Sequence, residues 1–305
     1  MKKSSGIKVG VFQITGDLQC GDPAIIAKRA EELGFESYWL PEHAVVPQGS
    51  CELYPGKQPG DPIPPYLFNM PDPLIGLSRA AVTTTEIRLG TGVALVPERN
   101  PLLAAIEIAS LDHYSGGRFV YGIGAGWNEL ECTVMGGDFA HRWAQTKEAV
   151  QVMKKLWTGE YVEHHGKYFD FPPTICLPKP TRRPHPPVLL GSIGSPNVYR
   201  RVVEWGDGWL PFCVDPQEIV IGKAEIAKIA KATGRNPATI EITAFAQPGM
   251  FRTARDVKAL ASAGADGVVL SLPEDNQADT LAQLEALAAA LFSQWISKYR
   301  ANAHS

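Results

Sequence analysis

Residues 88–131 read RLGTGVALVPERNPLLAAIEIASLDHYSGGRFVYGIGAGWNELE, and they contain one complete strand–helix–strand unit. An apolar run ends at Pro97, Asn100 opens a helical pattern, and a second apolar run covers residues 119–123. Two largely apolar strands joined by a crossover helix are typical of a parallel βαβ unit. Both strands finish in glycine-rich turns, where a backbone can approach a ligand closely. If the chain repeats this unit, we expect these turns to line a cofactor site.

The same unit recurs along the chain of 305 residues. Apolar segments that each precede a helical pattern cover residues 7–14, 35–41, 88–96, 119–123, 188–192, 208–212, 240–245 and 267–272. Eight such units predict an α/β fold, a closed (β/α)8 TIM barrel, rather than an open sheet. No shift in composition marks a boundary, so we expect one domain over residues 1–305. Residues 44–72, after the second strand, and 160–186, before the fifth, are interpreted as insertions.

Composition and charge narrow the class of protein. Hydrophobic residues make up 45% of the chain and charged residues 20%, which is ordinary for a globular protein with a sizeable core. A net charge of −3 gives no electrostatic argument for nucleic acid or an anionic membrane. No apolar run is long enough for a bilayer span or a signal peptide. We therefore expect a cytoplasmic protein that binds neither nucleic acid nor membrane.

The cysteines favour the same compartment. None belongs to a C-x-x-C pair, and their number is odd, which fits reduced thiols better than a disulfide framework or a zinc site. They are scattered along the chain as Cys20, Cys51, Cys132, Cys176 and Cys213.

In a barrel of this type, functional residues lie at the carboxyl ends of the strands. This rule selects Glu42 and His43, which follow the second strand. The pair supplies an acid and a base, and a histidine exchanges protons near neutral pH. Alternatively, His43 caps the strand end and bonds a loop, because an adjacent Glu-His pair is not specific by itself.

The turn after the fifth strand, residues 191–195, reads GSIGS and leads into a helix at Pro196. Free N–H groups at a helix N-terminus, together with two hydroxyls, bind phosphate well. We therefore favour a phosphate site here, with a tight turn that needs glycine for steric reasons alone as the alternative.

Two other enzyme classes fit poorly. Residues 122–126 read GIGAG, but a Rossmann fingerprint follows the first strand of an open sheet, and this is the fourth strand of a barrel. His164 and His165 are adjacent, so a strand would point them to opposite sides, and no H-x-H occurs. We therefore predict neither a Rossmann NAD site nor a metal centre.

Taken together, several segments resemble the luciferase-like monooxygenase superfamily, whose members are flavin or deazaflavin barrels. In chain order they are AEELGFESYWLPEH (30–43), RLGTGV (88–93), DHYSGGRFVYGIGAGWNELE (112–131), RWAQTKEAVQVMKKLW (142–157), GKYFDF (166–171) and PVLLGSIGSPNVYRRVVEWGDG (187–208). The resemblance covers essentially the whole chain. It implies an oxidoreductase that binds FMN or coenzyme F420 at the carboxyl end of its barrel.

The resemblance also implies roles for particular residues. In the family, a non-proline cis peptide bond in a bulge of strand three backs the central ring, and it maps to Gly92-Val93. The acid and histidine near the reacting ring edge map to Glu42 and His43. Contacts to the side chain and phosphate of the coenzyme map to Ala125, Gly126, Trp127, Gly191, Ser192, Gly194 and Ser195.

Three functional hypotheses follow. LPEHAVVP (40–47) is more similar to the deazaflavin branches than to the light-emitting luciferases, so the first is hydride transfer between C5 of F420 and a small organic substrate. In it, His43 acts as acid or base, and Glu42 orients His43 or shapes its pKa. The second is an FMN-dependent monooxygenase that uses O2 and a separate reductase. The third is a barrel that binds coenzyme without chemistry. Sugar-phosphate dehydrogenases of the family carry a glutamate where Trp127 stands, so their alcohol oxidation is not implied.

The substrate is not readable from the sequence. Apolar residues of the insertions and the sixth strand are candidate walls of its pocket, or else they pack the homodimer interface that the resemblance implies. These candidates are Tyr54, Tyr66, Phe68, Met70 and Trp209.

Overall fold

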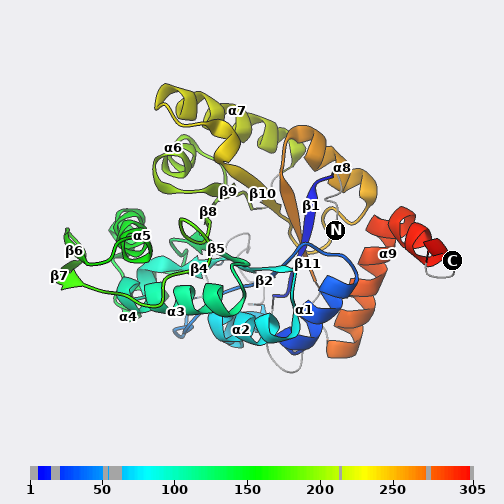
Figure 1. Cartoon of the computed structure of the whole chain (residues 1–305), viewed down its shortest axis with the longest axis horizontal. Coiled ribbons are helices and arrows are strands. Elements are labelled where there is room, and N and C mark those ends of the chain that lie inside the picture. The colour runs from blue at the N-terminus through cyan, green and yellow to red at the C-terminus, as the bar shows by residue number, and fades with distance from the viewer. Residues whose placement is uncertain are drawn as a thin grey trace.

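The computed structural model describes residues 6–14, 21–50, 54, 64–212, 215–272 and 276–302, and residues 293–302 by backbone alone. Parallel strands form a closed ring with helices around it (Figure 1). The hydrogen-bonded order is β3-β2-β1-β11-β10-β9-β8-β5, and pairing of β5 with β3 closes the ring. The predicted (β/α)8 TIM barrel is therefore confirmed. Its strands are β1 (Lys8–Phe12), β2 (Ser37–Leu40), β3 (Arg88–Thr91), β5 (Phe119–Gly124), β8 (Val188–Gly191), β9 (Gly208–Leu210), β10 (Glu241–Phe245) and β11 (Gly267–Ser271).

A short polar residue before a proline begins several of the helices. The Asp22 side chain accepts from the N–H of Ala24, Asn100 accepts from the N–H of Leu102, and proline occupies the first turn of both helices, as predicted. No helix within the described ranges is long and apolar enough to cross a membrane. The α-helices are α1 (Pro23–Glu32), α2 (Pro73–Thr83), α3 (Pro101–Tyr114), α4 (Glu129–Val134), α5 (Arg142–Thr158), α6 (Pro196–Trp205), α7 (Pro216–Ala232), α8 (Ala254–Ala263) and α9 (Gln277–Asn302).

The two insertions differ in form. Residues 160–186 contain the predicted hairpin, an antiparallel pair of β6 (Val162–His165) and β7 (Asp170–Thr174) that lies outside the barrel (Figure 1). In residues 44–72 the structure describes a 3₁₀ turn, η2 (Pro65–Phe68), whereas residues 51–53 and 55–63 fall outside the described part. Cys20, Cys51 and Cys213 also lie outside it, while Cys132 and Cys176 are free thiols.

The third strand is shorter than predicted. The apolar run over residues 88–96 divides into β3 and a short continuation, β4 (Ala94–Leu95), which pairs with β5. Between the two lies a cis peptide bond, Gly92–Val93, as the resemblance implied. A 3₁₀ turn, η3 (Val96–Glu98), then leads towards α3. Other 3₁₀ turns are η4 (Phe139–His141) and η5 (Pro237–Thr239).

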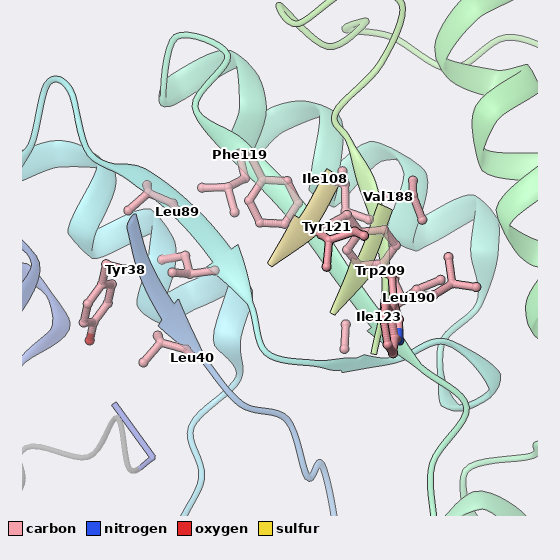
Figure 2. Close-up of a cluster of buried hydrophobic side chains, with 14 of the residues drawn as sticks. Tyr38, Leu40, Leu89, Ile108, Phe119, Tyr121, Ile123, Val188, Leu190 and Trp209 are labelled. Carbon is pink, nitrogen blue, oxygen red and sulfur yellow. The ribbon is translucent and has the colours of Figure 1, made fainter. Parts of the chain in front are cut away.

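Side chains alternate between two apolar layers. One layer, between strands and helices, contains Tyr38, Leu89 and Tyr121 and is drawn in Figure 2. The other fills the barrel and includes Trp39 and Phe245. The inner layer ends at the carboxyl side of the strands, where some of its members form the floor of a cavity.

Candidate functional site

A cavity of about 560 Å³ opens at the carboxyl ends of the barrel strands, and its lining is mostly apolar. This volume suits a small molecule or part of a coenzyme. Of the predicted site residues, the cavity brings together Glu42, His43, Gly92, Val93, Trp127, Gly191 and Ser192. The remaining four do not line it, and they are Ala125, Gly126, Gly194 and Ser195.

His43 is held in one orientation at the cavity wall. Its Nδ1 lies 2.7 Å from Oε2 of Glu131, a residue of α4 that is fully buried. A carboxyl oxygen in this place favours the tautomer in which Nδ1 donates to Glu131, and this tautomer leaves Nε2 to exchange a proton with a bound molecule. The imidazole also packs edge-on against Trp127, with ring centroids 5.5 Å apart.

Glu42 has different partners from those predicted. The N–H of Leu95 donates to Glu42 Oε2 at 2.6 Å, and Arg99 binds Oε1 through Nε at 2.7 Å. Burial raises the pKa of Glu42, although the positive charge of Arg99 opposes the shift. The expectation that Glu42 orients His43 is therefore corrected, because Glu131 makes that contact.

Sequence reasoning missed the role of Glu131 because the residue lies 88 positions from its partner. The short helix α4 was not predicted either, since six residues carry no clear apolar period. One local signal was available. The side chain of Asn128 accepts from the N–H of Glu131, which is how a polar cap residue begins a helix.

The glycines around the cis peptide bond make room for a side chain. A Cβ at Gly124 would lie 2.8 Å from Val93 Cγ2, and one at Gly191 would lie 2.6 Å from Val93 Cγ1. A Cβ at Gly92 would meet the ring of Phe245 at 2.6 Å. Gly124 and Gly191 therefore let Val93 sit between two strands, where it forms part of the cavity wall. Close approach of a ligand to the backbone of these turns stays a prediction.

Sequence reasoning missed two cations that lie near one another, Arg142 and Arg201, of which Arg142 contacts the turn that follows β5. Arg142 Nε donates to the carbonyl oxygen of Gly126 at 3.1 Å, and Arg201 stacks over the Trp143 ring, 4.4 Å from its centroid. Burial, followed by the neighbouring charges of Arg200 and Arg142, lowers the pKa of Arg201. Ser195 caps α6 and accepts from the N–H of Val198 at 3.3 Å. Clustered guanidinium groups beside a glycine turn suit an anion.

Three of the five predicted apolar walls line the cavity, namely Tyr54, Tyr66 and Met70. Tyr54 and Tyr66 join through their hydroxyls at 2.6 Å. Phe68 and Trp209 do not line it, and for Phe68 the alternative of a dimer interface stays a prediction. Phe68 is 60% exposed away from the cavity, whereas Trp209 is fully buried in the outer layer, where its Nε1 donates to the Ser192 carbonyl oxygen at 3.0 Å.

Residues 21–304 match the family model described as luciferase-like monooxygenase. The chain belongs to this family. It is 32% identical over 274 residues to an uncharacterised protein of Mycobacterium tuberculosis, covering 88% of this chain and 93% of the relative. It is also 35% identical over 138 residues to the oxygenase component of a flavin-dependent trigonelline monooxygenase from Acinetobacter baylyi, covering 45% of this chain and 38% of that one.

A solved structure shares the fold of this luciferase-like chain. The coenzyme F420-dependent tetrahydromethanopterin reductase of Methanopyrus kandleri superposes with a TM-score of 0.72 at 19% identity, covering 95% of this chain and all of the other. Family membership confirms the predicted oxidoreductase class. It supports a flavin-type cofactor and leaves F420 and FMN as the two candidates.

Proposed function

We propose that this chain transfers hydride between coenzyme F420 and a small organic substrate in the cavity described above. The observation that carries the proposal is His43, held by Glu131 at the wall of an apolar cavity. A fixed imidazole in such a place suits general acid–base work beside a redox ring.

The described residues fit a flavin-type coenzyme. Val93 and Trp127 offer apolar surface to a flat ring, and Arg142 and Arg201 offer charge to a phosphate-bearing tail. F420, when bound, supplies the carbon that accepts or donates hydride. The chain forms the wall of the cavity, exchanges the proton and excludes water.

Each polar residue of the wall then has a task. His43 exchanges a proton with the substrate through Nε2, while Glu131 accepts from Nδ1–H and stabilises the imidazolium charge. Glu42 holds the Leu95 backbone and Arg99, and so fixes the strand end from which His43 projects. The linked hydroxyls of Tyr54 and Tyr66 form a further polar part of the wall.

A second candidate is an FMN-dependent monooxygenase that consumes O2 and receives reduced FMN from a separate reductase. The likeness to the trigonelline monooxygenase of Acinetobacter baylyi favours it. His43 keeps the same acid–base task in this case. In both cases the insertion over residues 44–72 contributes Tyr54, Tyr66 and Met70 to the substrate pocket, whereas no residue of 160–186 lines it. We also propose a homodimer, which light scattering on the purified protein tests.

Titration of the purified protein with F420 and with FMN, oxidised and reduced, separates the two candidates. We expect saturable binding of F420 at micromolar concentration and weaker binding of FMN. Binding of FMN without F420 contradicts the proposal and leaves the monooxygenase. In either case His43→Asn should retain coenzyme binding and lose turnover. Unchanged turnover in this variant would contradict the acid–base role of His43.

A further inference from the structure

A second buried carboxyl group, that of Glu98, belongs to η3, and this turn contacts α4, the helix that carries Glu131. Glu98 ends η3 and is 6% exposed, yet neither of its carboxyl oxygens has a hydrogen-bond partner in the described part of the chain. A Cβ at Gly126 would lie 3.2 Å from Glu98 Oε1, so the carboxyl group lies against the turn that follows β5. A buried negative charge that accepts no hydrogen bond destabilises the fold, so the protonation state of Glu98 has to be explained.

The charged groups that act on Glu98 are two carboxylates and one cation. Glu131 and Glu42 act on it from α4 and from the end of β2, and Arg99 acts from the residue that follows η3. The Arg99 guanidinium is occupied elsewhere, because it binds Glu42, Asp72 and Glu107. Among the described residues it makes no hydrogen bond to Glu98.

Glu131 differs from Glu98 in one respect. Its Oε2 receives the imidazole N–H of His43, but its Oε1 is buried and unbonded, like both oxygens of Glu98. Two coupled carboxyl groups in an apolar setting do not both ionise readily. The negative charge belongs on the member that has a donor, which is Glu131, and the proton belongs on the member that has none.

The electrostatics agree with this assignment. Burial, then the charges of Glu131 and Glu42, raise the pKa of Glu98 to about 8, and Arg99 opposes the shift. We therefore expect Glu98 to lose its proton near pH 8, and the new negative charge should act on the ionisable groups around it, Glu131 among them.

We propose that Glu98 is a neutral carboxylic acid at pH 7 that donates its O–H to the free oxygen of Glu131, and that it acts as a positioning residue for His43. In this arrangement Glu131 stays a carboxylate and keeps accepting from His43 Nδ1. When Glu98 loses its proton to solvent, the pair carries two negative charges and favours the imidazolium form of His43. The proposal goes beyond the proposed function, because it concerns the chain's own protons whichever coenzyme binds.

Infrared spectroscopy of the purified protein tests the protonation state without any activity. A protonated carboxyl group absorbs separately from carboxylates, so the wild type at pH 7 should show a band that Glu98→Gln lacks. The band should vanish as the pH rises through about 8, and Glu129→Gln, an exposed change on the same helix as Glu131, should keep it. Because burial also raises the pKa of Glu42, the comparison is made on intensity, and a band of equal intensity in the wild type and in Glu98→Gln overturns the assignment.

Nitrogen NMR of the histidine rings tests the coupling to His43. Loss of a signal in His43→Asn assigns the resonances of this ring. In the wild type, the chemical shifts of the His43 ring nitrogens should change over the same pH range in which the infrared band disappears. Glu98→Gln should remove this change, and Glu98→Asp should retain it. If Glu98→Gln does not fold, Glu131→Gln serves instead, since removal of the neighbouring charge should move the infrared transition to lower pH. Identical His43 titrations in wild type and variants, or an unmoved infrared transition, contradict the proposal.

Discussion

Replacing Glu98 by glutamine should change how the stability of the protein depends on pH. The pKa of this carboxyl group is raised from 4.5 to about 8 in the fold, mainly by burial. Between these values the unfolded chain releases the proton that the folded chain keeps, so the wild type loses stability as pH rises from about 4.5 to about 8. Glutamine does not titrate, so the variant should lack this loss.

The size of the effect follows from the shift. Integrated between pH 5 and pH 9, the free energy of unfolding of the wild type should fall relative to the variant by about 4 kcal/mol at most. Relaxation and water entry reduce such values, so we expect about 2 to 4 kcal/mol. An unpaired buried amide costs about 1 to 3 kcal/mol, but equally at every pH. The slope against pH is therefore the diagnostic quantity, and the absolute stability of the variant is not.

Urea unfolding at pH 5, 7 and 9 measures this slope for the wild type, Glu98→Gln and the control Glu129→Gln. Groups that titrate in both proteins cancel in the difference. The control should run parallel to the wild type, because Glu129 is exposed. Parallel curves for Glu98→Gln as well would refute the reasoning, since they would mean that Glu98 ionises alike in the folded and unfolded chains.

Other substitutions test the rest of the site. Glu131→Gln replaces the charged acceptor of the imidazole N–H by a neutral amide oxygen and so removes the charge that stabilises the imidazolium. Turnover should therefore fall by about 10- to 100-fold with coenzyme binding nearly unchanged, as steady-state kinetics and titration would report. Gly191→Ala places a Cβ 2.6 Å from Val93 Cγ1 and should weaken coenzyme binding by about tenfold, and the added change Val93→Ala should restore it; failure of that rescue would contradict the packing argument. Arg142→Gln should weaken binding of the phosphate-bearing coenzyme by about tenfold and leave its phosphate-free analogue unaffected in the same titration.

Local chemistry made much of the fold predictable. Asp22 and Asn100 each precede a proline, and both begin helices in the structure as this pattern indicates. The apolar strand runs were equally clear. Trp209 shows where the pattern fails, because strands of a closed barrel are buried on both faces and carry no alternation that separates inside from outside. Without that signal, a side chain of the outer layer was placed in the cavity.

The site was predictable in position but not in pairing. Position after strand two was enough to select His43, since the fold determines where strand ends meet. Its partner comes from a six-residue helix far along the chain, and nothing local links the two. The glycines were recognised too, but one reason for them, the packing of Val93, could not be read from the sequence. Only the structure shows that a Cβ at Gly124 or Gly191 would collide with the side chain of Val93.

The ion pairs of Arg99 have a consequence for how loop length in this barrel can vary during evolution. The guanidinium binds Glu42, where the insertion over residues 44–72 departs, and Asp72, where it returns. Asp72 also begins α2 by accepting from the N–H of Leu74, so one cation fastens both ends of the segment to the barrel. A loop whose ends are fixed can gain or lose residues at small entropic cost. Tyr54, Tyr66 and Met70 of this segment line the cavity, so changes in its length alter the choice of substrate while His43 stays in place.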